Sequence, residues 1–262
     1  MAEVRMELVR RAHSTVLKLV GTLGPRSHAI VRDGLLKAAT EAPDGLIADV
    51  SELGFTRDAQ LTVFALVAMR LGDWPGIPFA LVTRHPDQAE VLRRSPVARY
   101  ARVHGSAADA ERRFGDPVRR QAVREFPRAG TTSSSAREFV TETCRAWGIP
   151  ELADDAAAIV TEFVENTLQH TGSRPEVRVD LRRGICTVAV ADEDPLPAEL
   201  RERDTATEPG LGLQLVAQFA RGWGCSRSWS GGKVVWATLR VPRDTGRITT
   251  PRSEKNRDSR EW

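Results

Sequence analysis

The sequence has few cysteines, no long apolar run and little net charge, and each of these shortages excludes a class of protein. Its three cysteines, Cys144, Cys186 and Cys225, are odd in number and lack metal-ligand spacing. They therefore indicate reduced thiols in the cytoplasm rather than a disulfide framework or a zinc site. No stretch approaches the roughly 18 apolar residues that a membrane-spanning helix needs. The first residues lack the apolar segment and cleavage site of a signal peptide, so we expect a cytoplasmic protein with no membrane partner.

Lysine is also scarce, with 4 lysines against 34 arginines, and the formal net charge is only +3. The pI near 9.0 is of the kind found in nucleic-acid-binding proteins. However, residues 243–262 contribute two of the three net positive charges, and no basic-aromatic stripe or recognition motif is present. We therefore expect no direct contact with nucleic acid.

What is present is a chain of 262 residues, 41% hydrophobic and 28% charged, which fits two modest domains. This composition excludes a disordered chain and a collagen-like repeat. Gly115-Asp116-Pro117 interrupts the pattern and marks a domain boundary. We expect domains at 1–114 and 115–242 and a disordered polar tail at 243–262.

Over residues 1–114, strands alternate with helices, which is typical of an α/β unit with a partly parallel sheet. The expected strands are a hairpin within 5–21, then 45–50 and 77–83. The expected helices are one from Pro25, an apolar one at 59–71, one near 87–94 and one that Ser106 caps and that ends by Phe114.

Over residues 115–242, two long helices lie between strands. The expected strands are 118–126, 176–182, 185–191, 225–230 and 233–241. The expected helices are 136–147, 152–170 and one from Gly210 to about Arg221.

The most informative segment is the run from Glu162 to His170. Glu162 and Asn166 lie one helical turn apart, 40° from each other around the axis, while apolar residues cover the opposite side. A carboxamide oxygen is a ligand for Mg²⁺, and a carboxylate beside it can orient or deprotonate a nucleophile. By itself, such a pair more often belongs to an ordinary solvated helix face.

Two later features add to this pair. Asp192 ends an apolar strand, where its carboxylate can accept a hydrogen bond from an exocyclic amine such as that of adenine. Gly210-x-Gly212 precedes an apolar helix, whose free N–H groups and dipole can hold phosphates. Each alone is weak, since a turn-forming Asp and a tight loop are common.

In this order, the residues of 118–242 resemble the Bergerat-type ATPase superfamily, and most closely its anti-sigma factor serine kinases. Glu162-x-x-x-Asn166 matches the N box, Asp192 the G1 box, Gly210-x-Gly212 the G2 box and Gly232–Trp236 the final hairpin. The resemblance implies an α/β sandwich with helices over one face of a mixed sheet. It also implies ATP and Mg²⁺, with Asn166 binding Mg²⁺, Glu162 as general base, Asp192 contacting adenine, and Gly210 and Gly212 cradling phosphates.

The sequence departs from the family at Asp194, where many relatives have glycine two residues after the G1 aspartate. A charged side chain then stands where backbone would approach the nucleotide. The segment between Asp192 and Gly210 is short, so any lid over ATP is small.

Residues 1–114 resemble a STAS domain, the fold of anti-sigma factor antagonists. The resemblance rests on the strand and helix order and on the run Asp49–Thr56 leading into an apolar helix. Antagonists begin this helix with Asp-Ser-Ser-Gly, whose first serine accepts phosphate, whereas this sequence has Arg57-Asp58-Ala59-Gln60. Asp58 thus occupies the switch position with a permanent charge, which either fixes the domain in one binding state or simply caps the helix.

Together the two resemblances imply a partner-switching regulator: an ATP-dependent serine/threonine kinase that phosphorylates a STAS-domain partner, or a catalytically inactive ATP-binding module. The implied partners are a sigma factor or a STAS-domain antagonist, and a homodimer is also implied. A histidine kinase fragment is less consistent with the sequence, because His13, His28, His85 and His104 fall in the first α/β domain.

Overall fold

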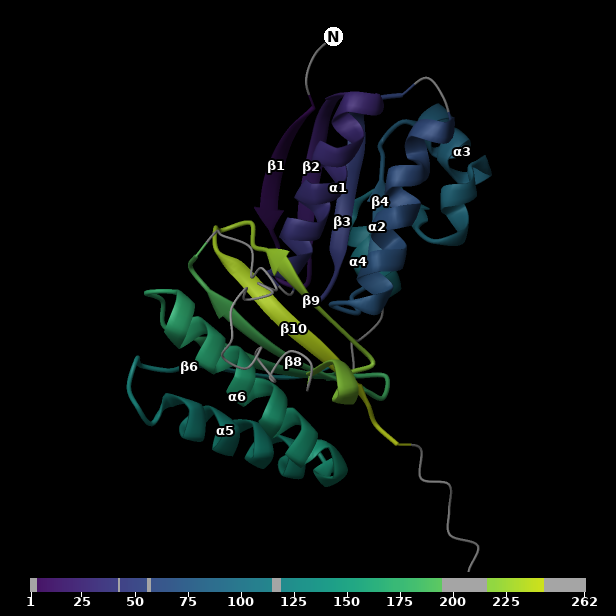
Figure 1. The fold of residues 1–262 in the computed structure, drawn as a ribbon. Coiled ribbons are helices and arrows are strands. Elements are labelled where there is room, and N and C mark those ends of the chain that lie inside the picture. The colour runs from purple at the N-terminus through teal and green to yellow at the C-terminus, as the bar shows by residue number, and fades with distance from the viewer. Residues whose placement is uncertain (1–3, 42, 56–57, 115–118, 195–215, 243–262) are drawn as a thin grey trace, which may run out of the picture.

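The protein is described by a computed structural model that places residues 4–41, 43–55, 58–114, 119–194 and 216–242. These residues form two five-stranded sheets, each with its own helices (Figure 1). We call strands β1 to β5 with helices α1 to α4 the N-terminal unit, and strands β6 to β10 with helices α5 and α6 the C-terminal unit. The polar tail expected at 243–262 lies outside the described residues.

The N-terminal sheet has the order β1-β2-β3-β4-β5 and is partly parallel, as predicted. Strands β1 and β2 form the expected antiparallel hairpin, and β2 to β5 run parallel to one another. Strand β5 was missed by the prediction, because three residues are too short to show an alternating pattern. The strands are β1 Arg5–Arg10, β2 Thr15–Thr22, β3 Leu46–Gly54, β4 Phe79–Val82 and β5 Arg102–His104.

Helices cover both faces of this sheet. Helices α1 and α2 pack on one face through residues such as Leu35 and Phe64, and α4 packs on the other through Ala110. The Ser106 hydroxyl accepts the Asp109 N–H at 3.1 Å and caps α4, as the sequence predicted. The helices are α1 Pro25–Thr40, α2 Thr62–Asp73, α3 Pro86–Arg94 and α4 Ala107–Phe114, with short 3-10 turns η1 Asp58–Leu61 and η2 Pro96–Arg99.

The C-terminal sheet has the order β6-β7-β8-β10-β9, and the expectation of a mixed sheet was wrong, because every described pairing in it is antiparallel. The α5–α6 pair returns the chain to the end where β6 stops, so Glu125 pairs with Glu176 and β7 runs back along β6. Tight turns join β7 to β8 and β9 to β10. The elements are β6 Arg119–Glu125, α5 Thr132–Ala146, η3 Pro150–Leu152, α6 Ala153–His170, β7 Glu176–Arg182, β8 Ile185–Asp192, β9 Gly222–Arg227 and β10 Lys233–Arg240.

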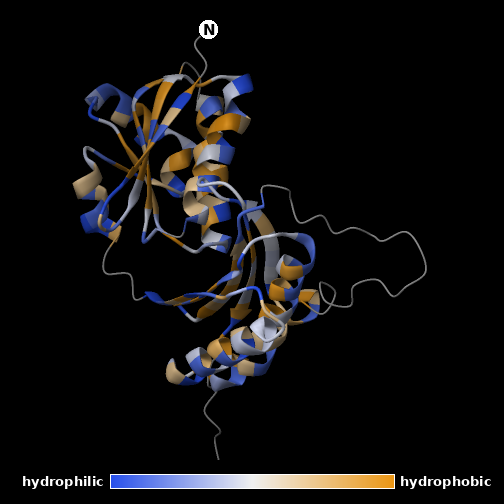
Figure 2. Ribbon diagram, turned by 90° about the vertical axis from the view of Figure 1, so that its left-hand side faces the viewer, coloured by the Kyte–Doolittle hydropathy of each residue, from blue (hydrophilic) through white to orange (hydrophobic). Residues whose placement is uncertain are grey.

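The helices of the C-terminal unit cover one face of its sheet only. Alternate residues, such as Val179, Val188 and Ala237, point to α5 and α6 and form the core. In Figure 2 the hydrophobic colour concentrates in the sheets and in the helix sides turned toward them. The other face, with Ala189 and Trp236, packs against the N-terminal unit. Within the part of the chain described here, no helix combines the length and apolar character needed to cross a bilayer.

Candidate functional site

Helix α6 carries the predicted Glu162 and Asn166. The negative charges of Asp154 and Asp155 in its first turn interact favourably with the positive end of the helix dipole. The apolar side of the helix is buried against the sheet. Glu162 and Asn166 lie one turn apart beside this apolar side, and both are half-buried. The structure thus confirms their helical placement and their common face.

The environment of Glu162 makes its carboxylate a stronger base. Burial raises the pKa of Glu162, and the charge of Glu165, three residues further along the helix, raises that pKa further. A carboxylate whose pKa approaches the working pH is better suited to accept a proton from a nucleophile.

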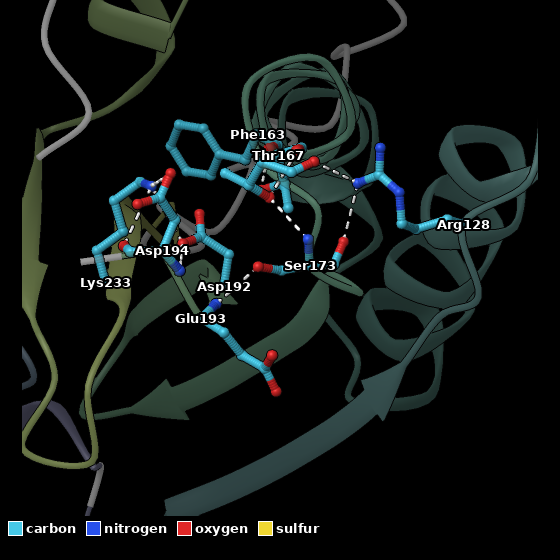
Figure 3. A network of polar contacts seen from close by, with 9 residues as sticks. Arg128, Phe163, Thr167, Ser173, Asp192, Glu193, Asp194 and Lys233 are labelled. Carbon is cyan, nitrogen blue, oxygen red and sulfur yellow. Dashed lines mark hydrogen bonds and ion pairs between the residues drawn. The ribbon is translucent and has the colours of Figure 1, made fainter. Parts of the chain in front are cut away.

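Asp192 is the last residue of β8, and its side chain points into the space between the sheet and α6 (Figure 3). This side chain is only 1% exposed. Its Oδ1 accepts hydrogen bonds from Lys233 Nζ at 3.1 Å and from the Asp194 backbone N–H at 2.9 Å. Burial raises the pKa of Asp192, and the hydrogen bond and charge of Lys233 only partly oppose this effect.

Lys233 is a site residue to which the sequence analysis gave no role. It begins β10 and pairs directly with Asp192 in the antiparallel register, so the two side chains meet on one face. Lys233 Nζ also donates to the Asp194 carbonyl oxygen at 3.4 Å and lies 4.0 Å from the Asp194 carboxylate. The signal in the sequence was a lysine directly after a Gly-Gly turn, but its partner depended on strand pairing.

Gly232 explains why that turn contains glycine. It has a φ of +72°, which L side chains rarely adopt, and a Cβ there would lie 2.0 Å from the Asp192 carbonyl oxygen. The turn therefore rests directly on the backbone of Asp192 and fixes where β8 ends.

A polar network ties the end of α6 to the end of β8. The Arg128 guanidinium donates to the carbonyl oxygens of Leu168, Thr171 and Ser173, at 2.8, 2.7 and 3.0 Å. The Ser173 hydroxyl in turn accepts the backbone N–H of Glu193 at 3.0 Å (Figure 3). Arg128 was given no role from the sequence, yet it helps fix the helix that carries Glu162 and Asn166 against the strand that carries Asp192.

Some predicted site residues are not placed. Gly210 and Gly212 lie outside the described residues, as does the first half of the helix expected at 210–221. In the described half, residues 216–219 are helical and 220–221 are not. Asp58 begins η1 directly before α2, so the apolar helix expected from residue 59 starts as a 3-10 turn.

Comparison with known proteins gives similarity at the level of structure. No family model matches the chain, and no curated protein matches it. An anti-sigma factor antagonist from Mycobacterium paratuberculosis is similar over 44% of this chain and 96% of its own, with 16% identity and a TM-score of 0.38. A STAS-domain anti-sigma factor antagonist from Planctomyces limnophilus is similar over 44% of this chain and 99% of its own, with 18% identity and a TM-score of 0.36.

A third structure contains two domains of a different kind. It shows the RsbU and RsbW domains of a Mycobacterium tuberculosis protein, and it is similar over 47% of this chain and 33% of its own, with 17% identity and a TM-score of 0.36. This chain therefore spans about a third of that structure. All three similarities cover less than half of this chain.

Proposed function

We propose that this chain is an ATP-binding regulator of a partner-switching pathway. The observation that carries the proposal is the buried carboxylate of Asp192 at a strand end, on the sheet face that α6 covers. The same helix carries Glu162 and Asn166, half-buried and one turn apart. A buried acceptor for an exocyclic amine thus lies on the same side of the sheet as a carboxylate-carboxamide pair.

These three side chains suit the binding of a nucleotide together with Mg²⁺. In the proposal, Asn166 would hold Mg²⁺ through its amide oxygen. Asp192 Oδ2 would accept a hydrogen bond from the exocyclic amine of adenine, since both described hydrogen bonds to this carboxylate go to Oδ1. Gly210 and Gly212 would hold phosphates, and bound ATP would supply its γ-phosphoryl group to the acceptor oxygen, with ADP as the leaving group. Glu162 removes the proton from the acceptor hydroxyl.

The acceptor in this proposal is a serine of a STAS-domain partner on another chain. The N-terminal unit packs on the opposite face of the C-terminal sheet from Asp192, as the stacking of Trp74 on Trp236 shows. Its own Asp58 also has no hydroxyl to phosphorylate. A sigma factor or a separate STAS antagonist is therefore the proposed partner.

A second candidate function is an ATP-binding module that does not transfer phosphate. The observation that favours it is the hydrogen-bonded cluster of Asp192, Asp194 and Lys233. Lys233 neutralises the carboxylate that would face adenine, and Asp194 adds a negative charge beside it. In this version, nucleotide only shapes a surface for the partner.

Labelled ATP and a serine-containing STAS substrate separate the two candidates. If the chain is a kinase, Glu162→Gln abolishes the transfer of labelled phosphate but keeps nucleotide binding. Asn166→Ala removes the Mg²⁺ dependence of nucleotide binding. Nucleotide binding is measured by calorimetry in both variants. Glu142→Gln is the matched control, because Glu142 is an exposed carboxylate on the neighbouring helix α5 and does not shift the pKa of Glu162. Binding without transfer supports the module, and no binding at millimolar ATP rules out both.

For the N-terminal unit, we propose that Asp58 holds the switch in one state, against the simpler alternative that it only caps the helix. Phosphopeptide mapping after incubation with a cognate kinase tests this. Phosphate on a residue near 58, such as Thr56, would contradict the fixed-state hypothesis.

A further inference from the structure

A cavity of about 850 Å³ lies between the two units. Its walls come from α1, the end of α2 and the following turn on one side, and from β7, β8, β9 and β10 on the other. It opens on the face of the C-terminal sheet that points away from Asp192, so it is distinct from the proposed nucleotide site. Its volume is in the range of small-molecule sites.

The charged side chains around this cavity are mostly positive. Six arginines line it, against two aspartates. One of the aspartates, Asp180, already accepts hydrogen bonds from Arg119 Nε and Gln121 Nε2, each at 2.9 Å. The arginines are Arg32 and Arg70 from the N-terminal unit and Arg119, Arg182, Arg183 and Arg221 from the C-terminal unit.

Arg182 shows that this positive charge is poorly balanced. Its guanidinium is half-buried and donates to the Gly76 carbonyl oxygen across the junction. Burial lowers the pKa of Arg182, and the charges of Arg183 and Arg119 lower it further, opposed only weakly by Asp44. An anion in the cavity would relieve this repulsion.

Four other arginines besides Arg119 line the cavity. Arg70, Arg183 and Arg221 are exposed at the rim, and Arg32 is half-buried beside Asp33, with which it forms a 2.7 Å ion pair. The wall between them is apolar and aromatic, with Leu36, Leu66 and the stacked pair of Trp74 and Trp236.

We propose that this cavity binds a phosphate-bearing small molecule with at least two negative charges, held by arginines of both units. The planar guanidinium fork matches phosphate oxygens two at a time, and several converging arginines select a multiply charged ligand. Enclosure by both units favours a small molecule over a nucleic-acid strand. Since Arg32 and Arg70 belong to one unit and Arg182 and Arg183 to the other, the ligand bridges the units and stabilises their contact.

Calorimetry with inorganic tripolyphosphate, without Mg²⁺ and in the full chain, tests the proposal. We expect one saturable site, a higher melting temperature on binding, and at least a tenfold loss of affinity in Arg32→Gln/Arg70→Gln. Arg32 and Arg70 lie on helices and not in a sheet, so we expect this double variant to keep its fold. It therefore tests the site even if Arg182→Gln, which removes a contact across the junction, destabilises the protein. The matched control Arg94→Gln removes an exposed arginine that pairs with Glu90 on its own helix and leaves affinity unchanged.

Gly210→Val/Gly212→Val distinguishes this site from the proposed nucleotide site, because the new side chains would stand where that site is proposed to hold phosphates. We expect this variant to leave tripolyphosphate binding unchanged. In that background, tighter binding of UDP than of pyrophosphate would identify a nucleotide as the ligand, and equal binding would identify phosphate alone. The proposal is overturned if tripolyphosphate does not saturate one site, if the arginine variants keep full affinity, or if Gly210→Val/Gly212→Val removes binding. If substitution of these arginines lowers the melting temperature but leaves the affinity for tripolyphosphate unchanged, the arginines are structural contacts only and the proposal is also overturned.

Discussion

Trp74 and Trp236 stack across the junction of the two units, with ring centroids 4.9 Å apart and planes 1° from parallel. Trp74 follows α2 in the N-terminal unit, and Trp236 lies in the middle of β10. Hydrogen bonds also cross the junction, from Arg119 to the Pro43 carbonyl oxygen and from Arg178 to that of Thr40, both at 3.2 Å. The face of the C-terminal sheet that carries no helix of its own is therefore packed against the N-terminal unit.

Loss of this stack should destabilise the junction. Trp74→Ala removes a large side chain that is 7% exposed, and we expect it to lower the free energy of unfolding by about 3 kcal/mol or more. In a double-mutant cycle with Trp236→Ala, measured by denaturant unfolding, the coupling should be about 0.5–1.5 kcal/mol. Trp223 packs on the opposite face of the same sheet, so Trp74→Ala and Trp223→Ala should be additive. A zero coupling between Trp74 and Trp236 would contradict the stacked arrangement.

Glu41 makes the junction sensitive to acid. Burial raises its pKa, but hydrogen bonds from the Ser228 hydroxyl and from the backbone and hydroxyl of Ser230, with the charge of Arg10, outweigh burial and leave the pKa below its ordinary value of 4.5. A lowered pKa in the folded state means that stability from these contacts is present above pH 4.5 and is lost as the pH falls through the folded value.

Glu41→Gln should therefore cost about 1 kcal/mol at neutral pH and progressively less below pH 4.5. Melting temperatures of wild type and variant across pH 3 to 7 would measure this convergence. Glu7→Gln removes an exposed ion pair with Lys18 and should change stability by less than about 0.5 kcal/mol at pH 7. A constant difference between wild type and Glu41→Gln at all pH values would argue against the assigned contacts.

The ion pair of Lys233 and Asp192 is buried, with the two side chains 7% and 1% exposed. Lys233→Met leaves an uncompensated carboxylate, and we expect a loss of about 3–5 kcal/mol in the free energy of unfolding. Asp192→Asn in the same chain should recover part of that loss. Lys18→Met, which breaks an exposed pair, should cost less than about 1 kcal/mol. Equal effects of the two lysine variants in chemical denaturation would show that the Asp192 pair is not buried.

The three cysteines should differ in reactivity. Cys144 and Cys186 are buried together in the core of the C-terminal unit, whereas Cys225 is exposed. The hydrogen bond with Cys144, together with burial, raises the pKa of Cys186. A thiol reagent at pH 8 should therefore modify one thiol quickly in the folded protein and three after unfolding. Cys225→Ser should remove the fast reaction, and two fast thiols in that variant would refute the burial of the pair.

Much of the local structure was predictable, because the signals that set it are local. Proline at Pro25 starts α1, Ser106 caps α4, and the turn at Arg183-Gly184 joins strands whose bounds match the prediction closely. The candidate pair Glu162 and Asn166 was also predictable, since helical periodicity alone puts two residues four apart on one face.

The sequence by itself determined the α/β class, the positions of most helices and strands, and the face of α6 that carries Glu162 and Asn166. Only the tertiary structure decided that Lys233 pairs with Asp192, that the C-terminal sheet is antiparallel, and that Trp74 meets Trp236 over an arginine-lined cavity. Periodicity and capping act over a few residues of chain. The pairing of β8 with β10 and the packing between units join residues 41 or more positions apart, and no pattern along the sequence specifies which of them meet.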